Sequence, residues 1–128
     1  MDTRRARLIV GSLVLTFVII RVMLHMSPDS DFGVAGYNIH HLFTGILLIT
    51  IGGIPLTLFP GRSVLLDLSA LLFGAGLSLM LDEWVYLIAT DGTNASYLLP
   101  VSLRGGIIMI ALAVLYVGIL YMVSNKRR

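Results

Sequence analysis

The chain has 128 residues, of which 57% are hydrophobic and only 12% are charged, and its formal net charge is +2. Its mean hydropathy of +0.94 lies well outside the usual soluble range, which excludes a soluble globular domain and predicts an integral membrane protein. Cysteine is absent, which excludes disulfides and thiolate metal sites. Because the basic residues flank apolar runs, we expect membrane lipids and no nucleic acid as partners.

Four apolar runs follow one another along the chain, each close to the roughly 20 residues that a helix needs to cross the hydrocarbon core. Polar stretches separate them, namely "SPDSDFG", "PGRS" and "TDGTNAS" followed by Pro100. None of the runs alternates with the period of two that is typical of strands. We therefore predict a single membrane domain, 1–128, with helices over residues 8–26, 39–59, 64–89 and 101–123.

The first run also has the charged start and apolar centre of a signal peptide, in "RRARLIVGSLVLTFVII". The small-residue stretch "GVAG", which is the candidate cleavage site, lies too far beyond the apolar centre. We therefore predict an uncleaved membrane anchor.

Helices satisfy their own backbone hydrogen bonds in lipid, and short connections place consecutive helices side by side. The predicted fold class is therefore an all-α membrane protein, an antiparallel four-helix transmembrane bundle. Basic residues gather on one side of this bundle, at Arg4, Arg5, Arg7, Arg62, Lys126, Arg127 and Arg128. The positive-inside rule then predicts that both termini are cytoplasmic.

Seven ionisable side chains are predicted to lie on the opposite side, in the outer leaflet. A rise of about 1.5 Å per residue places each within about 10 Å of the outer boundary. Charges at such depth turn inward, pair with one another or extend to the interface. We therefore expect one polar cluster that draws on all four helices: Arg21, His25, His40, His41, Asp82, Glu83 and Arg104.

Adjacent residues on a helix point about 100° apart, so neither the histidine pair nor the acidic pair is expected to face one point together. We expect His41 and Asp82 to face the interior, because small residues share their helix faces. His40 and Glu83 are then expected to face a neighbouring helix or the interface.

Two imidazoles and two carboxylates form the ligand set of iron, manganese and zinc sites, which helical bundles build from inward side chains. A divalent transition metal is therefore the candidate cofactor, with His40, His41, Asp82 and Glu83 as its ligands. The spacing matches no metal-binding motif, however, and two nearby arginines oppose a cation. A structural network of salt bridges and hydrogen bonds is therefore the favoured interpretation, with the metal site open beside it.

Three classes of function follow from this cluster. The first is a non-enzymatic membrane protein whose cluster binds a divalent metal or serves as a polar interaction site, in a homo-oligomer or a membrane complex. The second is a membrane-embedded metalloenzyme, which requires an open coordination position on a stoichiometric metal. The third is an oligomeric proton or ion conductor, in which histidine and carboxylate relay the charge.

The stretches "IHHLFTG" and "GAGLSLMLDEW" carry a resemblance over residues 37–86. The chain resembles a group of small prokaryotic integral membrane proteins that have an Ile-His-His helix and a later Leu-Asp-Glu-aromatic helix. The matching positions are His40, His41, Gly45, Gly74, Asp82 and Glu83, with Trp84 at the aromatic position. The resemblance implies a membrane bundle with a cluster of histidines and acids, and it implies no catalytic assignment.

Overall fold

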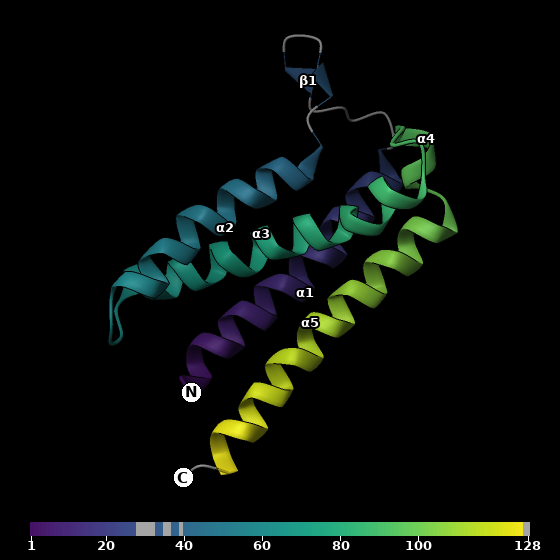
Figure 1. The fold of residues 1–128 in the computed structure, drawn as a ribbon. Coiled ribbons are helices and arrows are strands. Elements are labelled where there is room, and N and C mark those ends of the chain that lie inside the picture. Colours follow the sequence, from purple (N-terminus) through teal and green to yellow (C-terminus); the bar gives the residue numbers. More distant parts are fainter. Residues whose placement is uncertain (28–32, 35–36, 39, 127–128) are drawn as a thin grey trace.

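Helices make up most of the computed structural model, which describes residues 1–27, 33–34, 37–38 and 40–126. The elements follow in the order α1 (Thr3–Met26), β1 (Gly33–Val34), β2 (Tyr37–Asn38), α2 (His41–Leu58), α3 (Val64–Ala89), α4 (Asn94–Tyr97) and α5 (Pro100–Lys126). The two strands pair antiparallel over two residues each. Within these described residues, four helices are long and apolar enough to cross a membrane: α1, α2, α3 and α5 (Figure 1).

The four long helices correspond to the four predicted spans, and α3 agrees at both ends. α1 begins at Thr3 rather than at residue 8, because the Asp2 side chain caps its first turn and accepts two backbone N–H groups. α5 begins at Pro100, a residue whose fixed φ suits the first helical position. α2 begins at His41, whereas its predicted start, residue 39, lies outside the described residues. The predicted spans included neither the short α4 nor the β1–β2 pair.

Helix α3 is the core of the fold. It contacts α1, α2 and α5, and α1 also contacts α5. In its most apolar stretch 44% of the residues are buried, compared with 6 to 11% in the other three long helices. Figure 1 shows α3 between α2 and α5. The remaining helices therefore pack on α3 and leave their outer faces exposed.

Glycines bring the backbones of α2 and α3 into contact. A Cβ atom on Gly52 would lie 2.5 Å from the carbonyl oxygen of Ser69, and one on Gly45 would lie 2.6 Å from that of Gly76. Both separations are too short for real atoms, so a side chain at either position would force the helices apart. Small residues allow such close approach in membrane proteins, where dispersion contacts replace the hydrophobic effect between helices.

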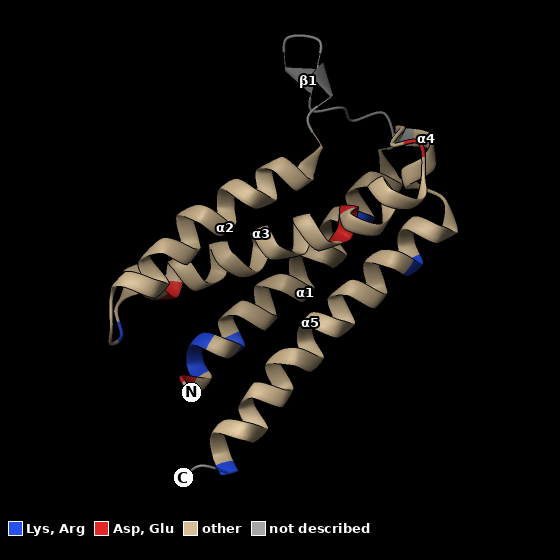
Figure 2. Ribbon diagram, viewed as in Figure 1, with Lys and Arg blue, Asp and Glu red and all other residues tan. Residues whose placement is uncertain are grey.

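Polar contacts join the N-terminal end of the chain both to the turn between α2 and α3 and to the end of α5. The Arg62 Nε donates to the Asp2 carboxylate at 3.2 Å, and the Met1 backbone nitrogen donates to the Ser124 hydroxyl at 2.9 Å. The N-terminus and the C-terminal end of α5 accordingly lie at the same end of the molecule (Figure 1). Most of the Lys and Arg positions gather at this end (Figure 2).

The contact at Gly52 predicts a specific loss of stability. The change Gly52→Ala should lower the free energy of unfolding by about 1–3 kcal/mol, because overpacking forces backbone shifts. Gly118→Ala is the matched control, since a Cβ there meets nothing within 4 Å. Thermal unfolding of both variants in detergent measures the effect. Equal melting temperatures in the two variants would show that α2 and α3 are not in backbone contact at Gly52.

Candidate functional site

The Asp82 carboxylate lies at the centre of the described polar groups and is fully buried. The Arg21 guanidinium, on α1, reaches its Oδ1 through Nη2 at 2.6 Å and Nε at 2.7 Å. The other carboxylate oxygen, Oδ2, accepts the Tyr97 hydroxyl and lies 3.1 Å from Nε2 of His41. Three elements besides α3 therefore meet at this one side chain: α1, α2 and α4.

Glu83 faces the start of α2 and is 3% exposed. Its Oε2 accepts the backbone N–H of Leu42 at 2.7 Å, and its Oε1 lies 3.2 Å from Nδ1 of His40. No side chain of α2 itself caps the helix at His40. The Glu83 carboxylate takes that role, since it satisfies a first-turn N–H and places a negative charge at the positive end of the helix dipole.

His41 bridges the two carboxylates. Its Nε2 lies 3.1 Å from Asp82 Oδ2, and its Nδ1 lies 3.3 Å from Glu83 Oε1. A neutral imidazole has one N–H, so only the doubly protonated ring donates to both acids.

Tyr97 and Ser102 also belong to this group of polar residues, although neither was predicted to take part in it. Burial raises the pKa of the Tyr97 hydroxyl, and the adjacent Asp82 carboxylate raises it further, so this hydroxyl stays protonated and donates. The Arg21 carbon Cζ also lies 4.2 Å from the centre of the Tyr97 ring. The Arg21 Nη2 donates to both the carbonyl and the hydroxyl oxygen of Ser102, at 3.1 and 3.2 Å.

The start of α5 passes directly over the Arg21–Asp82 pair. A Cβ on Gly106 would lie 2.7 Å from Asp82 Oδ1 and 3.1 Å from Arg21 Nη2. A Cβ on the neighbouring Gly105 would lie 2.4 Å from the Val85 side chain of α3. The paired glycines in "LRGG" are thus the sequence signal that this part of α5 covers the ion pair.

Five of the seven predicted polar residues come together in this ion-pair cluster, which also includes Tyr97 and Ser102: Arg21, His40, His41, Asp82 and Glu83. The structure places His25 and Arg104 outside it, where both are exposed and form no hydrogen bond or ion pair with another described residue. Residues two apart on a helix point about 200° apart, so Arg104 turns outward because Gly106 turns inward. His25 lies in the last turn of α1, where a cation suits the helix dipole.

Asp82 and Glu83 point toward different neighbouring helices, as the offset of about 100° between adjacent helical residues requires. Asp82 and Glu83 are both buried, because one meets α1 while the other meets the start of α2. His40 precedes α2 with extended backbone angles, φ −57° and ψ 139°. The 100° rule for helical neighbours therefore does not apply between His40 and His41.

The geometry gives no support to the predicted metal site. The described residues contain no group of three or more His, Cys, Asp or Glu side chains arranged to hold a metal ion. All four carboxylate oxygens of Asp82 and Glu83 instead lie within hydrogen-bonding distance of nitrogen or hydroxyl groups of the protein. A cation would have to displace Arg21 and several of these donors before it could reach the acids.

Ser78 lies one turn from Asp82 on α3 and is fully buried. Its hydroxyl has no hydrogen-bond partner among the described residues. No described histidine or lysine contacts it as a base, so it fits the close-packing role expected of a small residue on this face.

No family model, curated protein or solved structure matches the chain. The resemblance to small membrane proteins with an Ile-His-His helix therefore stays a prediction.

The Arg21–Asp82 pair should have a large effect on stability. Asp82→Asn leaves a buried guanidinium without its counter-charge, and breaking a buried pair in this way costs about 3–5 kcal/mol. Asp67→Asn is the control, because the Arg4–Asp67 pair is partly exposed and such pairs contribute about 1 kcal/mol or less.

A double-mutant cycle compares the unfolding of wild type, Asp82→Asn, Arg21→Met and the double variant Arg21→Met/Asp82→Asn. The double variant should be more stable than the sum of the single losses implies, because it leaves no unpaired charge. Strict additivity would show that the two groups do not interact.

Proposed function

We propose that the protein is an integral membrane protein with four antiparallel transmembrane helices and both termini in the cytoplasm. In this proposal the ion-pair cluster lies in the outer leaflet and holds the helices in register, so that its role is internal and non-enzymatic. The main support for the proposal is that groups on α1, α2 and α4 form hydrogen bonds with both buried carboxylates.

The position of the charges supports the orientation. The end that contains the two termini and the α2–α3 turn carries Arg4, Arg5, Arg7 and Arg62, of which Arg4 and Arg62 pair with acids. The opposite end holds the ion-pair cluster and the loop with Asp91. Cytoplasmic loops carry an excess of Lys and Arg, so the basic end belongs in the cytoplasm.

The chemistry of the cluster supports an internal role over a catalytic one. A catalytic metal site keeps an open coordination position, and an enzyme that uses nucleophilic catalysis keeps its nucleophile within reach of the substrate. Here Asp82 and Glu83 are buried, and the rings of His40 and His41 contact these carboxylates. A conductor also requires a polar path beyond the cluster, whereas the buried charged side chains of the described chain are Asp82 and Glu83 alone.

Cysteine accessibility tests the orientation. The chain has no cysteine, so single cysteines can be introduced without background. A membrane-impermeant maleimide should label Ala95→Cys in intact cells, because α4 lies on the outer side. It should label Pro60→Cys and Asn125→Cys only after the membrane is permeabilised, and the reverse pattern would invert the proposed topology.

Elemental analysis separates the internal role from a metal site. The protein, purified without a tag, should remain free of stoichiometric metal after incubation with iron, zinc and manganese, and its melting temperature should not rise. The variant His40→Ala/His41→Ala should be less stable than wild type and equally metal-free. Near-stoichiometric metal in wild type that is lost in this variant would overturn the proposal.

A further inference from the structure

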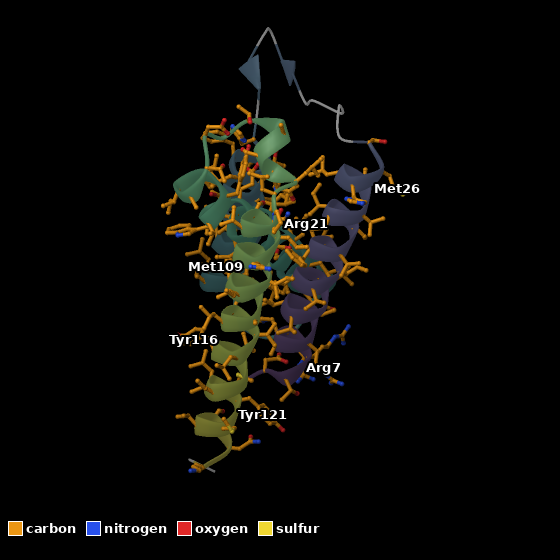
Figure 3. All side chains as sticks on the ribbon, turned by 90° about the vertical axis from the view of Figure 1, so that its right-hand side faces the viewer. Arg7, Arg21, Met26, Met109, Tyr116 and Tyr121 are labelled. Carbon is orange, nitrogen blue, oxygen red and sulfur yellow. The ribbon has the colours of Figure 1, made fainter. Side chains whose placement is uncertain are left out.

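A groove of about 750 Å³ lies between the first half of α1 and the second half of α5, far from the ion-pair cluster. This volume falls in the range of about 300–1,000 Å³ that is typical of small-molecule sites. The residues that give the groove its character come from both helices and are Arg7, Val10, Gly11, Val114, Gly118 and Tyr121. Figure 3 shows Arg7 and Tyr121 at the lower ends of α1 and α5.

Two glycines keep the groove open. A Cβ on Gly11 or Gly118 meets nothing within 4 Å, whereas one on Gly52, Gly74 or Gly106 would collide with a neighbouring helix. The groove glycines therefore make no close helix contact. Between them the walls are formed by valine side chains, which offer no polar partner. An occupant of this part of the groove must be apolar.

Arg7 gives the polar end of the groove a positive charge without an internal counter-charge. Its Nε donates to the carbonyl oxygen of Thr3, and it forms no ion pair with a described residue. Its neighbour Arg4 pairs with Asp67, and Arg62 pairs with Asp2. The Arg7 guanidinium is therefore exposed and able to bind an anion from outside the chain.

We propose that this groove binds one anionic phospholipid, with an acyl chain between the valines and glycines and the phosphate on Arg7. The proposal rests on the proposed function for the leaflet, which is the cytoplasmic one. An apolar body with an anionic head matches the two halves of the groove, and a guanidinium binds phosphate in a bidentate manner. Tyr121, a groove residue of the kind enriched at membrane interfaces, adds a hydroxyl donor near the head group.

Lipid binding to the purified full chain tests the proposal. Native mass spectrometry from detergent compares dioleoyl phosphatidylglycerol with dioleoyl phosphatidylcholine. Wild type should bind the anionic lipid about fivefold more tightly, the preference expected from about 1 kcal/mol per basic residue near the head group. Arg7→Gln should reduce this preference, although the Met1 amino group also lines the groove, and Gly118→Leu should weaken the binding of both lipids by filling the groove.

Matched variants control for charge and bulk. Lys126→Gln removes a cation at the same end, and Ala111→Leu adds bulk to an exposed position of α5 that does not line the groove. Both should bind lipid as wild type does. If Gly118→Leu does not fold, Gly11→Leu fills the same groove from the α1 side.

Three results would overturn the proposal. They are equal affinity of wild type for the two lipids, unchanged binding in the leucine variant, and a disulfide between two copies through Gly118→Cys, which would seat a second copy in the groove. Lipid binding in detergent does not depend on orientation in the cell. A reversed cysteine-labelling pattern would therefore move the site to the other leaflet without removing it, so the two proposals fail separately.

Discussion

The rest of the structure depends on one buried ion pair, between Asp82 of α3 and Arg21 of α1. A carboxylate that is fully buried is tolerated only when its charge is compensated and its oxygens are hydrogen-bonded. This pair constrains three other elements. His41 of α2 and Tyr97 of α4 must lie next to the Asp82 carboxylate, and α5 needs a residue without a side chain, Gly106, where it passes over the pair. Three long helices and one short helix are thereby positioned at one end of α3.

Different interactions position the helices at the two ends of the molecule. Near the cluster, directional hydrogen bonds and charges determine where each helix sits, and glycines bring α5 over Asp82. Along α2 and α3 the contact is between backbones at Gly45, Gly52 and Gly76, without polar side chains. At the opposite end α1 and α5 separate and leave a groove. The fold is therefore well packed around α3 and open between its outer helices.

This division of roles also explains how a helix with buried acids is compatible with lipid. The exposed faces of the bundle carry large apolar side chains, such as Leu15, Ile108 and Leu115, whereas the acidic residues face inward. Charged groups within a bilayer are expected to face the bundle interior and to pair with one another. The polar cluster and the apolar exterior are two consequences of the same requirement.

The sequence by itself determined the all-helical class, the four apolar helices and most of the polar residues that gather at one end of them, because hydropathy, span length and charge placement are local properties of the chain. Only the tertiary structure decided the partners. Arg21 rather than Arg104 pairs with Asp82, and His40 takes part because it precedes the helix. Tyr97, which follows the polar loop after α3, donates its hydroxyl to Asp82. Which residues pair depends on how each helix is rotated about its axis and how closely the helices approach, and a sequence pattern contains neither quantity.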